Sequence, residues 1–438
     1  MRFPGRGRKA RQRTSLPPWS LAVDRIRRSW LELPAAEQLS FANGAFQAMG
    51  LTLLGTFLPL LLLDGLHATA QDIALLNSLP NLVGLVAVLL GAVWLNRTRN
   101  LLRLSVLMFI GARIFLPLMA GAPFLGAGAA VGALLIMNAV MNFPGAVANM
   151  GWQAYIGTLI SPERRAGFFA ERNRVLNLAG MAVAIVAGIV LQAFRPSLLW
   201  PYQGALAIAG VFAIGEVRYL MRHPSLPDPP APMRGNLFQT WRRLLQTGRF
   251  RRVFTSAMVF VLCWQMAWPL FPLWQIGVAH ATAFWVALFG VLGQAGAILS
   301  LQAWGRASVK AGIHWPLFVA ALGVATSPVL TVMSRNLDWL AFVNLTMGVF
   351  GAGFTMLLFN QLLDATPPGD RTSMVAVYNI GLAAVGLLAP ELGVSLLGVL
   401  HLRGTMDLSS GLRAMAAFGF LWAGGVSLVR RRGPALSA

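Results

Sequence analysis

Charged residues are scarce in this chain: Asp, Glu, Lys and Arg make up 11% of its 438 residues, whereas apolar residues make up 57%. Soluble domains contain about 25% charged residues, because their surface must be hydrated. A chain with so few charges cannot cover a globular fold with a wettable surface. The composition therefore excludes an ordinary soluble protein and favours one that resides in a lipid bilayer.

Cysteine and lysine are nearly absent, and both shortages exclude functions. The single cysteine, Cys263, stands inside an apolar run, so an internal disulfide and a thiolate metal site are excluded. The two lysines, Lys9 and Lys310, follow Arg8 and Val309, whereas a Walker loop needs Gly-Lys-Ser/Thr. The five histidines lack metal-ligand spacing, and no nucleophile–base set occurs. We therefore expect no enzyme, no ATP hydrolysis by that route, no metal and no cofactor.

Long apolar segments are what the chain has in abundance. Each is about 20 residues long, which is the length that an α-helix needs to cross the hydrocarbon core of a bilayer. Backbone amides in lipid have no water to bond, so such segments must be helical. The 12 predicted spans are 41–66, 72–95, 101–121, 125–149, 174–194, 200–220, 253–276, 281–304, 313–333, 339–362, 376–401 and 408–429.

A proline-rich stretch divides these spans into two sets of six. Pro224, Pro227, Pro229 and Pro230 follow the sixth span closely and cannot continue a helix, so they mark a linker. A short basic interfacial helix is predicted after them, near Trp241–Leu245. The predicted organisation is a basic tail at 1–40, a helical half at 41–220, a linker at 221–252, a second half at 253–429 and a tail at 430–438.

The net charge of +21 is distributed unevenly along the chain. Of the 35 Lys and Arg residues, 30 lie in the tails and the even-numbered loops, and the four predicted on the other side are Arg195, Arg335, Arg403 and Arg413. Basic residues stay on the cytoplasmic side, so both termini and the linker are predicted to be cytoplasmic. Nucleic-acid binding is not expected, because it needs a basic stripe on a soluble fold. The Arg-rich tail is either an amphipathic helix on an anionic inner leaflet or a solvated tail.

The two halves carry traces of a duplication. In the loops after the fourth and tenth spans, three residue types recur at an offset of 206: Pro162/Pro368, Arg165/Arg371 and Asn173/Asn379. Equivalent loops with the same spacing predict parallel repeats related by an axis along the membrane normal.

Two six-helix halves, cytoplasmic termini, a long central loop and a Pro-x-x-Arg loop in each half resemble the major facilitator superfamily. The resemblance implies an all-α polytopic membrane protein of about 12 helices in two pseudo-symmetric halves. Gly91 and Arg99 fit the superfamily motif between helices two and three, whereas Leu95 and Thr98 replace its Asp and second Gly. The segment SPERRAGFF at 161–169 is similar to a broad prokaryotic group of the superfamily, which implies no substrate.

The family resemblance places helices one, four, seven and ten around a central cavity, so polar and aromatic side chains on them are the candidate substrate ligands. These candidates are Asn43, Gln47, Asn138, Asn142, Gln265, Trp268, Asn344 and Asn360. With Asn149, the two asparagines of helix four form a polar stripe on one face. Amides in membrane helices also bond neighbouring helices, so a structural role is the alternative.

A few charged residues suggest coupling and gating. Glu391 is predicted near the midplane of helix eleven, where an ionised carboxylate is costly, and is therefore the candidate for proton coupling. Arg113, in helix three, is expected to snorkel or to pair with a backbone carbonyl. The residues expected to form a cytoplasmic gate are Arg165, Arg371, Asp364 and Asp370. The two arginines are expected to hold the helix ends together through acids or helix C-termini.

These features predict a secondary active transporter that moves a small organic solute by alternating access, with proton-coupled export as one form. A cavity polar by amides and aromatics suits a neutral or amphipathic solute better than a phosphate or dicarboxylate, which needs an arginine cluster. The alternative is a non-transporting scaffold or assembly factor for another membrane complex. The expected setting is a multi-pass monomer in the inner cell membrane, with the solute and an anionic inner leaflet as partners.

A topology reporter fused after Ala438 and another inserted near Pro229 are both expected to report a cytoplasmic location. Each site lies on the side that carries the excess of basic residues. Reporter activity in intact cells measures this, and an external signal at either site contradicts the predicted arrangement of spans.

Overall fold

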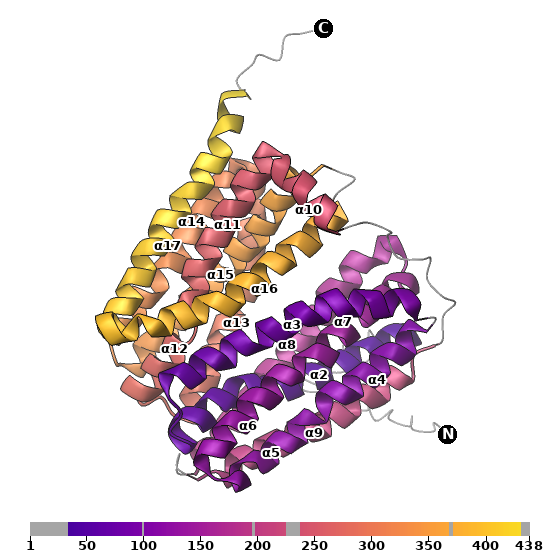
Figure 1. The fold of residues 1–438 in the computed structure, drawn as a ribbon, viewed down its shortest axis with the longest axis vertical. Helices are drawn as coiled ribbons and strands as arrows, with labels where there is room; N and C mark the ends of the chain where they lie inside the picture. Colours follow the sequence, from indigo (N-terminus) through magenta and orange to yellow (C-terminus); the bar gives the residue numbers. More distant parts are fainter. Residues whose placement is uncertain (1–33, 99, 195–197, 225–236, 368–370, 431–438) are drawn as a thin grey trace, which may run out of the picture.

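The computed structural model describes residues 34–98, 100–194, 198–224, 237–367 and 371–430, and every regular element within them is a helix. Figure 1 shows two helix bundles, one formed by the first half of the chain (indigo to magenta) and one by the second half (red to yellow). The predicted all-α membrane fold is confirmed.

The first bundle contains the predicted spans one to six, three of them interrupted within the span. Its elements are α2 (Ala35–Leu60) with the π-helical turn η1 (Leu61–Gly65), α3 (Ala70–Arg97), α4 (Leu101–Arg113) with α5 (Phe115–Gly121) and η2 (Ala122–Leu125), α6 (Ala127–Val140) with α7 (Asn142–Leu159), α8 (Pro162–Gln192) and α9 (Trp200–Met221). Side chains cap two of these helices: Thr69 and Asp72 form a capping box at α3, and Asn100 accepts a hydrogen bond from the backbone N–H of Arg103 at α4.

The second bundle follows a short helix of the linker. Its elements are α10 (Leu237–Gln246), α11 (Gly248–Met266) with α12 (Leu270–Pro272) and η3 (Leu273–Val278), α13 (Ala283–Ala311), α14 (His314–Val332), α15 (Leu337–Ala365), α16 (Arg371–Ser395) and α17 (Leu397–Arg430). Span seven is broken between Met266 and Leu270, where Pro269 and Pro272 interrupt the backbone hydrogen bonding.

Eleven helical stretches of the described chain are long and apolar enough to cross a membrane, and they correspond to the first eleven predicted spans. The twelfth predicted span, 408–429, lies within α17. The boundaries of span eleven differ from the prediction of 376–401: α16 begins at Arg371 and ends at Ser395. The helix accommodates Pro390 and ends shortly after it, so the whole span is shifted toward the N-terminus.

A second duplicated segment, which the sequence reasoning missed, marks equivalent points of the two halves. The residues His-Ala-Thr-Ala occur at 67–70 and again at 280–283, each time after the π-helical turn that ends the first span of its half. His67 and His280 have φ values of 53° and 54°, a left-handed conformation that is uncommon for residues other than glycine. In both copies the following threonine is the N-cap of the next helix. The two segments therefore make the same turn.

The halves approach each other through two symmetric pairs of helices. α3 packs against α16, and α8 packs against α13. A twofold axis that exchanges spans two and eight, and spans five and eleven, exchanges these two pairs. The arrangement is the one expected of the parallel repeats that the loop motifs predicted.

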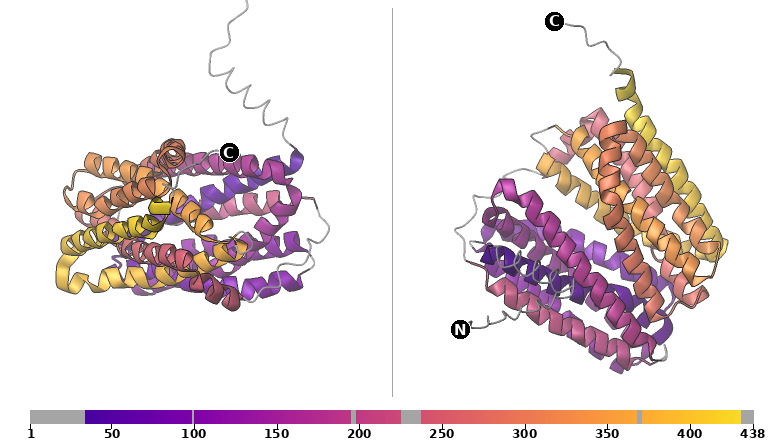
Figure 2. Two further views of the ribbon diagram at one scale, coloured as in Figure 1. Left: turned by 90° about the horizontal axis from the view of Figure 1, so that it is seen from above. Right: turned by 180° about the vertical axis from the view of Figure 1, so that it is seen from behind.

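The contacts between the halves concentrate at one end of the molecule, here called the closed face; the end that carries α10 is called the linker face. Ile276 and Ala287 of the second half pack into the apolar core of the first half, near the ends of η3 and α13 that lie at the closed face. Ala74, in the second turn of α3, belongs to a core of the second half. In Figures 1 and 2 the bundles diverge toward the linker face.

A buried arginine corrects one assignment of the sequence analysis. Arg413 was predicted on the outer side of the membrane, but it lies within α17 and is fully buried. Its guanidinium donates to the backbone oxygens of Cys263 (3.1 Å), Trp264 (2.9 Å) and Val324 (3.2 Å), and to Ser327 Oγ (3.2 Å). Arg413 therefore ties α17 to α14 and to the end of α11, directly before the break in span seven.

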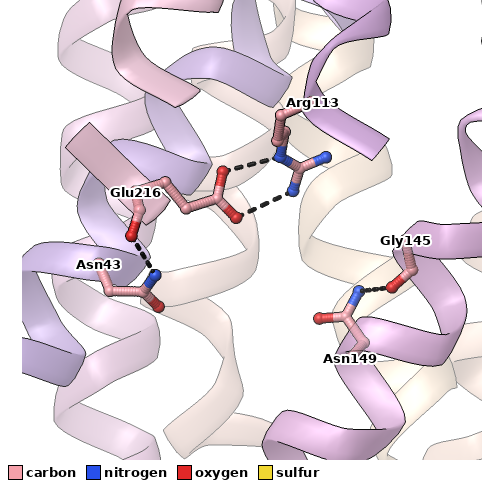
Figure 3. Close-up of polar contacts among 5 residues, drawn as sticks. All are labelled: Asn43, Arg113, Gly145, Asn149 and Glu216. Carbon is pink, nitrogen blue, oxygen red and sulfur yellow. Dashed lines mark hydrogen bonds and ion pairs between the residues drawn. The ribbon is translucent and has the colours of Figure 1, made fainter. Parts of the chain in front are cut away.

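A second buried arginine makes an ion pair that was not foreseen. Arg113 Nε lies 2.7 Å from Glu216 Oε2, and Arg113 Nη2 lies 3.1 Å from Oε1, so the pair is bidentate (Figure 3). The two side chains are 7% and 1% exposed. Asn43 Nδ2 donates to the backbone oxygen of Glu216 at 2.8 Å, which joins α2 to the pair. The expected pairing of Arg113 with a backbone carbonyl is wrong, because α9 places a carboxylate beside it.

Substitution of Arg113 by Met is expected to destabilise the protein by up to about 3–5 kcal/mol, because it leaves the buried carboxylate of Glu216 without its bidentate partner and only Arg172 as a nearby counter-charge. The double substitution Arg113→Met/Glu216→Leu removes both charges and is expected to recover most of that loss. Thermal unfolding in detergent measures both variants. A double variant as unstable as the single one contradicts the pairing argument.

Candidate functional site

A pocket of about 630 Å³ opens on the second half, between α11, α13 and α15. Its lining residues are Trp264, Phe289, Gly290, Gly293, Gln294, Ala297, Leu301, Asn344, Met347, Gly348, Gly351, Ala352, Thr355 and Met356. None of them carries a charge. The volume lies within the range of about 300–1,000 Å³ that is typical of small-molecule sites.

Glycines create the space of this pocket. A Cβ atom on Gly348 would lie 1.9 Å from the carbonyl oxygen of Gly293, so the backbones of α15 and α13 touch at their crossing. Beside that crossing, a Cβ atom on Gly290 would meet no other atom within 4 Å, so this glycine faces open space. The glycines thus hold the two helices together and leave an apolar recess next to the contact.

Few polar groups line the recess. Asn344 donates from Nδ2 to the backbone oxygen of Leu340 at 2.8 Å, and Thr355 donates to that of Gly351 at 2.9 Å. Gln294 is exposed. Such a site offers amide, hydroxyl and aromatic groups, but no formal charge, to a ligand.

The predicted ligands of the second half are only partly brought together here. Asn344 lines the pocket, whereas Gln265, Trp268 and Asn360 do not belong to its lining. Gln265 is 8% exposed, and Trp268 packs edge-to-face on Trp264 with ring centroids 6.2 Å apart. Trp268 therefore contacts Trp264, an aromatic residue of the pocket lining.

Gln294 and Phe289 were not selected from the sequence, although they line the pocket. Gln294 carries a usable signal, since it is an amide inside the apolar span of α13. The family resemblance, however, points to helices one, four, seven and ten, and α13 is the eighth span.

The predicted ligands of the first half mostly bond to backbone. Asn138 Nδ2 donates to Leu76 O on α3 at 3.4 Å, and Asn142 Nδ2 donates to Asn138 O at 2.6 Å. Asn149 Nδ2 likewise donates to Gly145 O at 3.0 Å (Figure 3). Only Asn43 and Asn138 bond a neighbouring helix, which is the structural role given as the alternative, whereas Asn142 and Asn149 bond to backbone four residues earlier in their own span. Gln47 is half-buried.

Glu391 lies at the interface between the halves and near the closed face. Its carboxylate accepts hydrogen bonds from Gln71 Nε2 (2.5 Å) and Ser78 Oγ (2.6 Å), both on α3. The expected midplane position is wrong, because Ser395 ends α16 one turn after Glu391. The side chain holds the two halves together instead of standing in the middle of the membrane.

Two further hydrogen bonds join the halves. Asn81 Nδ2 donates to Gly386 O at 3.3 Å, again between α3 and α16 but nearer the middle of both helices. Thr282 Oγ1 donates to Gln192 Oε1 at 3.4 Å between α13 and α8. Hydrogen bonds therefore reinforce both symmetric helix pairs.

At the linker face, Arg165 donates to the backbone oxygens of Ile160 (2.9 Å) and Gly157 at the end of α7. A helix C-terminus was one of the two kinds of partner predicted for it. Asp364 is exposed. Asp370 and the side chain of Arg371 lie outside the described part of the structure.

His223 joins the end of α9 to α2 at the same face. Its Nε2 lies 2.8 Å from Ser40 Oγ, and burial lowers the pKa of the imidazole. The neutral ring therefore serves as a structural hydrogen-bonding group at neutral pH.

Solved structures with a similar fold are membrane transporters. The crystal structure of the nucleoside transporter NupG is 11% identical, with a TM-score of 0.71 over 89% of this chain and 99% of that one. A POT family transporter in complex with a thioalcohol-conjugated peptide is 11% identical, with a TM-score of 0.70 over 90% and 97%. A bacterial homologue of the human lysosomal transporter Spinster, in an inward-facing and unoccupied conformation, is 14% identical, with a TM-score of 0.69 over 91% and 98%. At these identities the likeness shows the fold alone.

Sequence comparison identifies the family directly. No curated protein sequence matches the chain significantly. The family model of the Major Facilitator Superfamily matches residues 40–390, which include most of both helix bundles and the linker between them. The chain belongs to the Major Facilitator Superfamily of membrane transporters.

Proposed function

We propose that the protein is a secondary active transporter that carries a small neutral or amphipathic organic solute across the inner cell membrane by alternating access. The observation that carries this proposal is the uncharged pocket of about 630 Å³ on α11, α13 and α15. It lies in one of two bundles that touch mainly at one end, so a rocking motion of the halves alters access to it.

The proposed orientation places the linker face in the cytoplasm, as the distribution of basic residues predicts. The contacts at the closed face then make this an inward-facing conformation. The similar fold of the bacterial Spinster homologue, which is inward-facing and unoccupied, supports this interpretation. In the opposite state, Arg165 and Arg371 hold the cytoplasmic helix ends together, with Asp364 and Asp370 as available acids.

The chemistry of the pocket favours an uncharged solute. A phosphate or carboxylate ligand needs an arginine or lysine, and the lining residues include neither. Proteins of similar fold include a nucleoside transporter and POT family transporters in complex with a conjugated peptide or 5-aminolevulinic acid. The same architecture therefore accommodates small organic solutes in those proteins. Asn344, Gln294 and Thr355 are the proposed polar contacts.

Glu391 is the proposed coupling residue. When the halves separate at the closed face, its carboxylate loses the hydrogen bonds from Gln71 and Ser78. We propose that the carboxylate of Glu391 then takes up a proton, because the neutral acid does not need those two donors. Protonation and separation of the halves thereby become linked, which is what proton-coupled transport requires.

Substitution of Gly290 by Val is expected to abolish binding of solutes that stabilise the wild-type protein, because the new side chain occupies the pocket. Gly305→Val on the same helix is the matched control, since a Cβ there also meets open space but lies outside the pocket. A screen of solutes by thermal shift measures binding, because a ligand of the folded state raises its stability. Equal loss in both variants contradicts the pocket, and no stabilising solute in the wild type favours the scaffold alternative.

Substitution of Glu391 by Gln is expected to leave solute exchange intact and to abolish uphill uptake into proteoliposomes driven by a pH gradient. The amide keeps hydrogen-bonding capacity at the interface but cannot titrate. Asp407→Asn is the control, since Asp407 is an exposed acid on α17. Undiminished accumulation in Glu391→Gln removes this residue from the coupling mechanism.

A further inference from the structure

A group of arginines at the linker face has no part in the proposed transport cycle. The segment 237–253 contains Arg242, Arg243, Arg249, Arg251 and Arg252 and no acidic residue. None of the three ion pairs between described residues involves Arg242, Arg249 or Arg252. We propose that Arg249 and Arg252, with Trp422 beside them, form a binding site for the headgroup of an anionic phospholipid.

The helix α10 lies across this end of the second bundle (Figure 1). It contacts α11 and α16, and Leu244 anchors it with an exposure of 1%. Trp241 is 38% exposed and Arg242 is exposed. An amphipathic helix with a basic polar face and a tryptophan is suited to the boundary between headgroups and water.

The first turn of α11 supplies the site itself. Arg249 and Arg252 are three residues apart and share one face of the helix, while Phe250 and Val253 are buried on another. The guanidinium of Arg252 lies over the ring of Trp422 on α17, 6.0 Å from its centroid. Its Nε atom is buried and has no hydrogen-bond partner within the described structure.

This combination calls for an anionic acceptor. A phosphate oxygen accepts hydrogen bonds from arginine and is also favoured by the unpaired backbone amides at the start of a helix. The apolar surface beside the arginines indicates a lipid as its source. Val259 on α11 is 53% exposed, and Phe418 and Trp422 on α17 are 59% and 68% exposed, so acyl chains can lie next to the bound headgroup.

The site has a mechanical consequence, because α10 also contacts α16. A lipid that holds this corner at the membrane surface restrains the linker-face end of α16, whose other end carries Glu391. The lipid-binding proposal itself does not depend on transport.

The test uses the full-length protein in nanodiscs of phosphatidylglycerol and phosphatidylcholine in equal amounts, with retained lipid identified by native mass spectrometry. Arg249→Gln/Arg252→Gln is expected to weaken phosphatidylglycerol binding about 25-fold, since each charge contributes about fivefold. The matched control Arg103→Gln/Arg306→Gln removes two exposed arginines from the same face of the molecule and is expected to retain the lipid. Phosphatidylcholine is expected to be lost on extraction from every variant.

Any of three results overturns the proposal. An equal loss of phosphatidylglycerol in both double variants means that the basic face attracts anionic lipid only diffusely. Equal retention of phosphatidylcholine means that the headgroup charge is not recognised. If the glutamine variant does not fold, Arg249→Lys/Arg252→Lys is used instead, because it keeps both charges and loses only the bidentate hydrogen bonding of the planar guanidinium groups. This variant is expected to bind phosphatidylglycerol more weakly than the wild type but still to prefer it to phosphatidylcholine. Absence of that preference in the lysine variant also contradicts the site.

Discussion

Polar groups inside a bilayer have no water to bond, and this constraint explains how most polar side chains of the spans are arranged. Asn142 and Asn149 turn back to carbonyl oxygens of their own helices. Arg413 is satisfied by backbone oxygens and one hydroxyl, and Arg113 by the carboxylate of Glu216. The two buried arginines therefore join helices within each half, whereas these two asparagines satisfy their own span.

The contacts between the halves differ from those within them. Small residues such as Ala74 and Ala287 and a few hydrogen bonds form the closed face, where Glu391 is the charged group that accepts from the opposite half. No ion pair between described residues crosses this interface. The proposed alternating access requires these contacts between the halves to separate.

The two halves have the same architecture but differ in chemistry. The first half has a bidentate ion pair and amides bonded to backbone, while the second half has an uncharged recess between α13 and α15. The recess depends on the glycine contact of Gly293 with Gly348, which brings two helix backbones together. The proposed solute site therefore lies in one half only.

The sequence by itself determined the membrane environment, the helical class, the order of the spans and the family. These follow from local properties: apolar length, charge distribution and loop motifs are written along the chain and need no partner to be read. The duplication could also be recognised in the sequence. Besides the Pro-x-x-Arg loops, the sequence contains a second repeat, the His-Ala-Thr-Ala turn at 67–70 and 280–283.

Only the tertiary structure decided which polar residues face one another. Glu216 is a lone acid in an apolar span, and nothing local indicates that it pairs with Arg113 from another helix. The depth of Glu391 depended on where α16 begins and ends. The hydrogen bonds of Asn43 and Asn138 depended on which helix packs against each of them, α9 and α3 respectively. The rotation and depth of a membrane helix are set by its packing against neighbours, because a uniformly apolar segment carries no strong periodic signal for either.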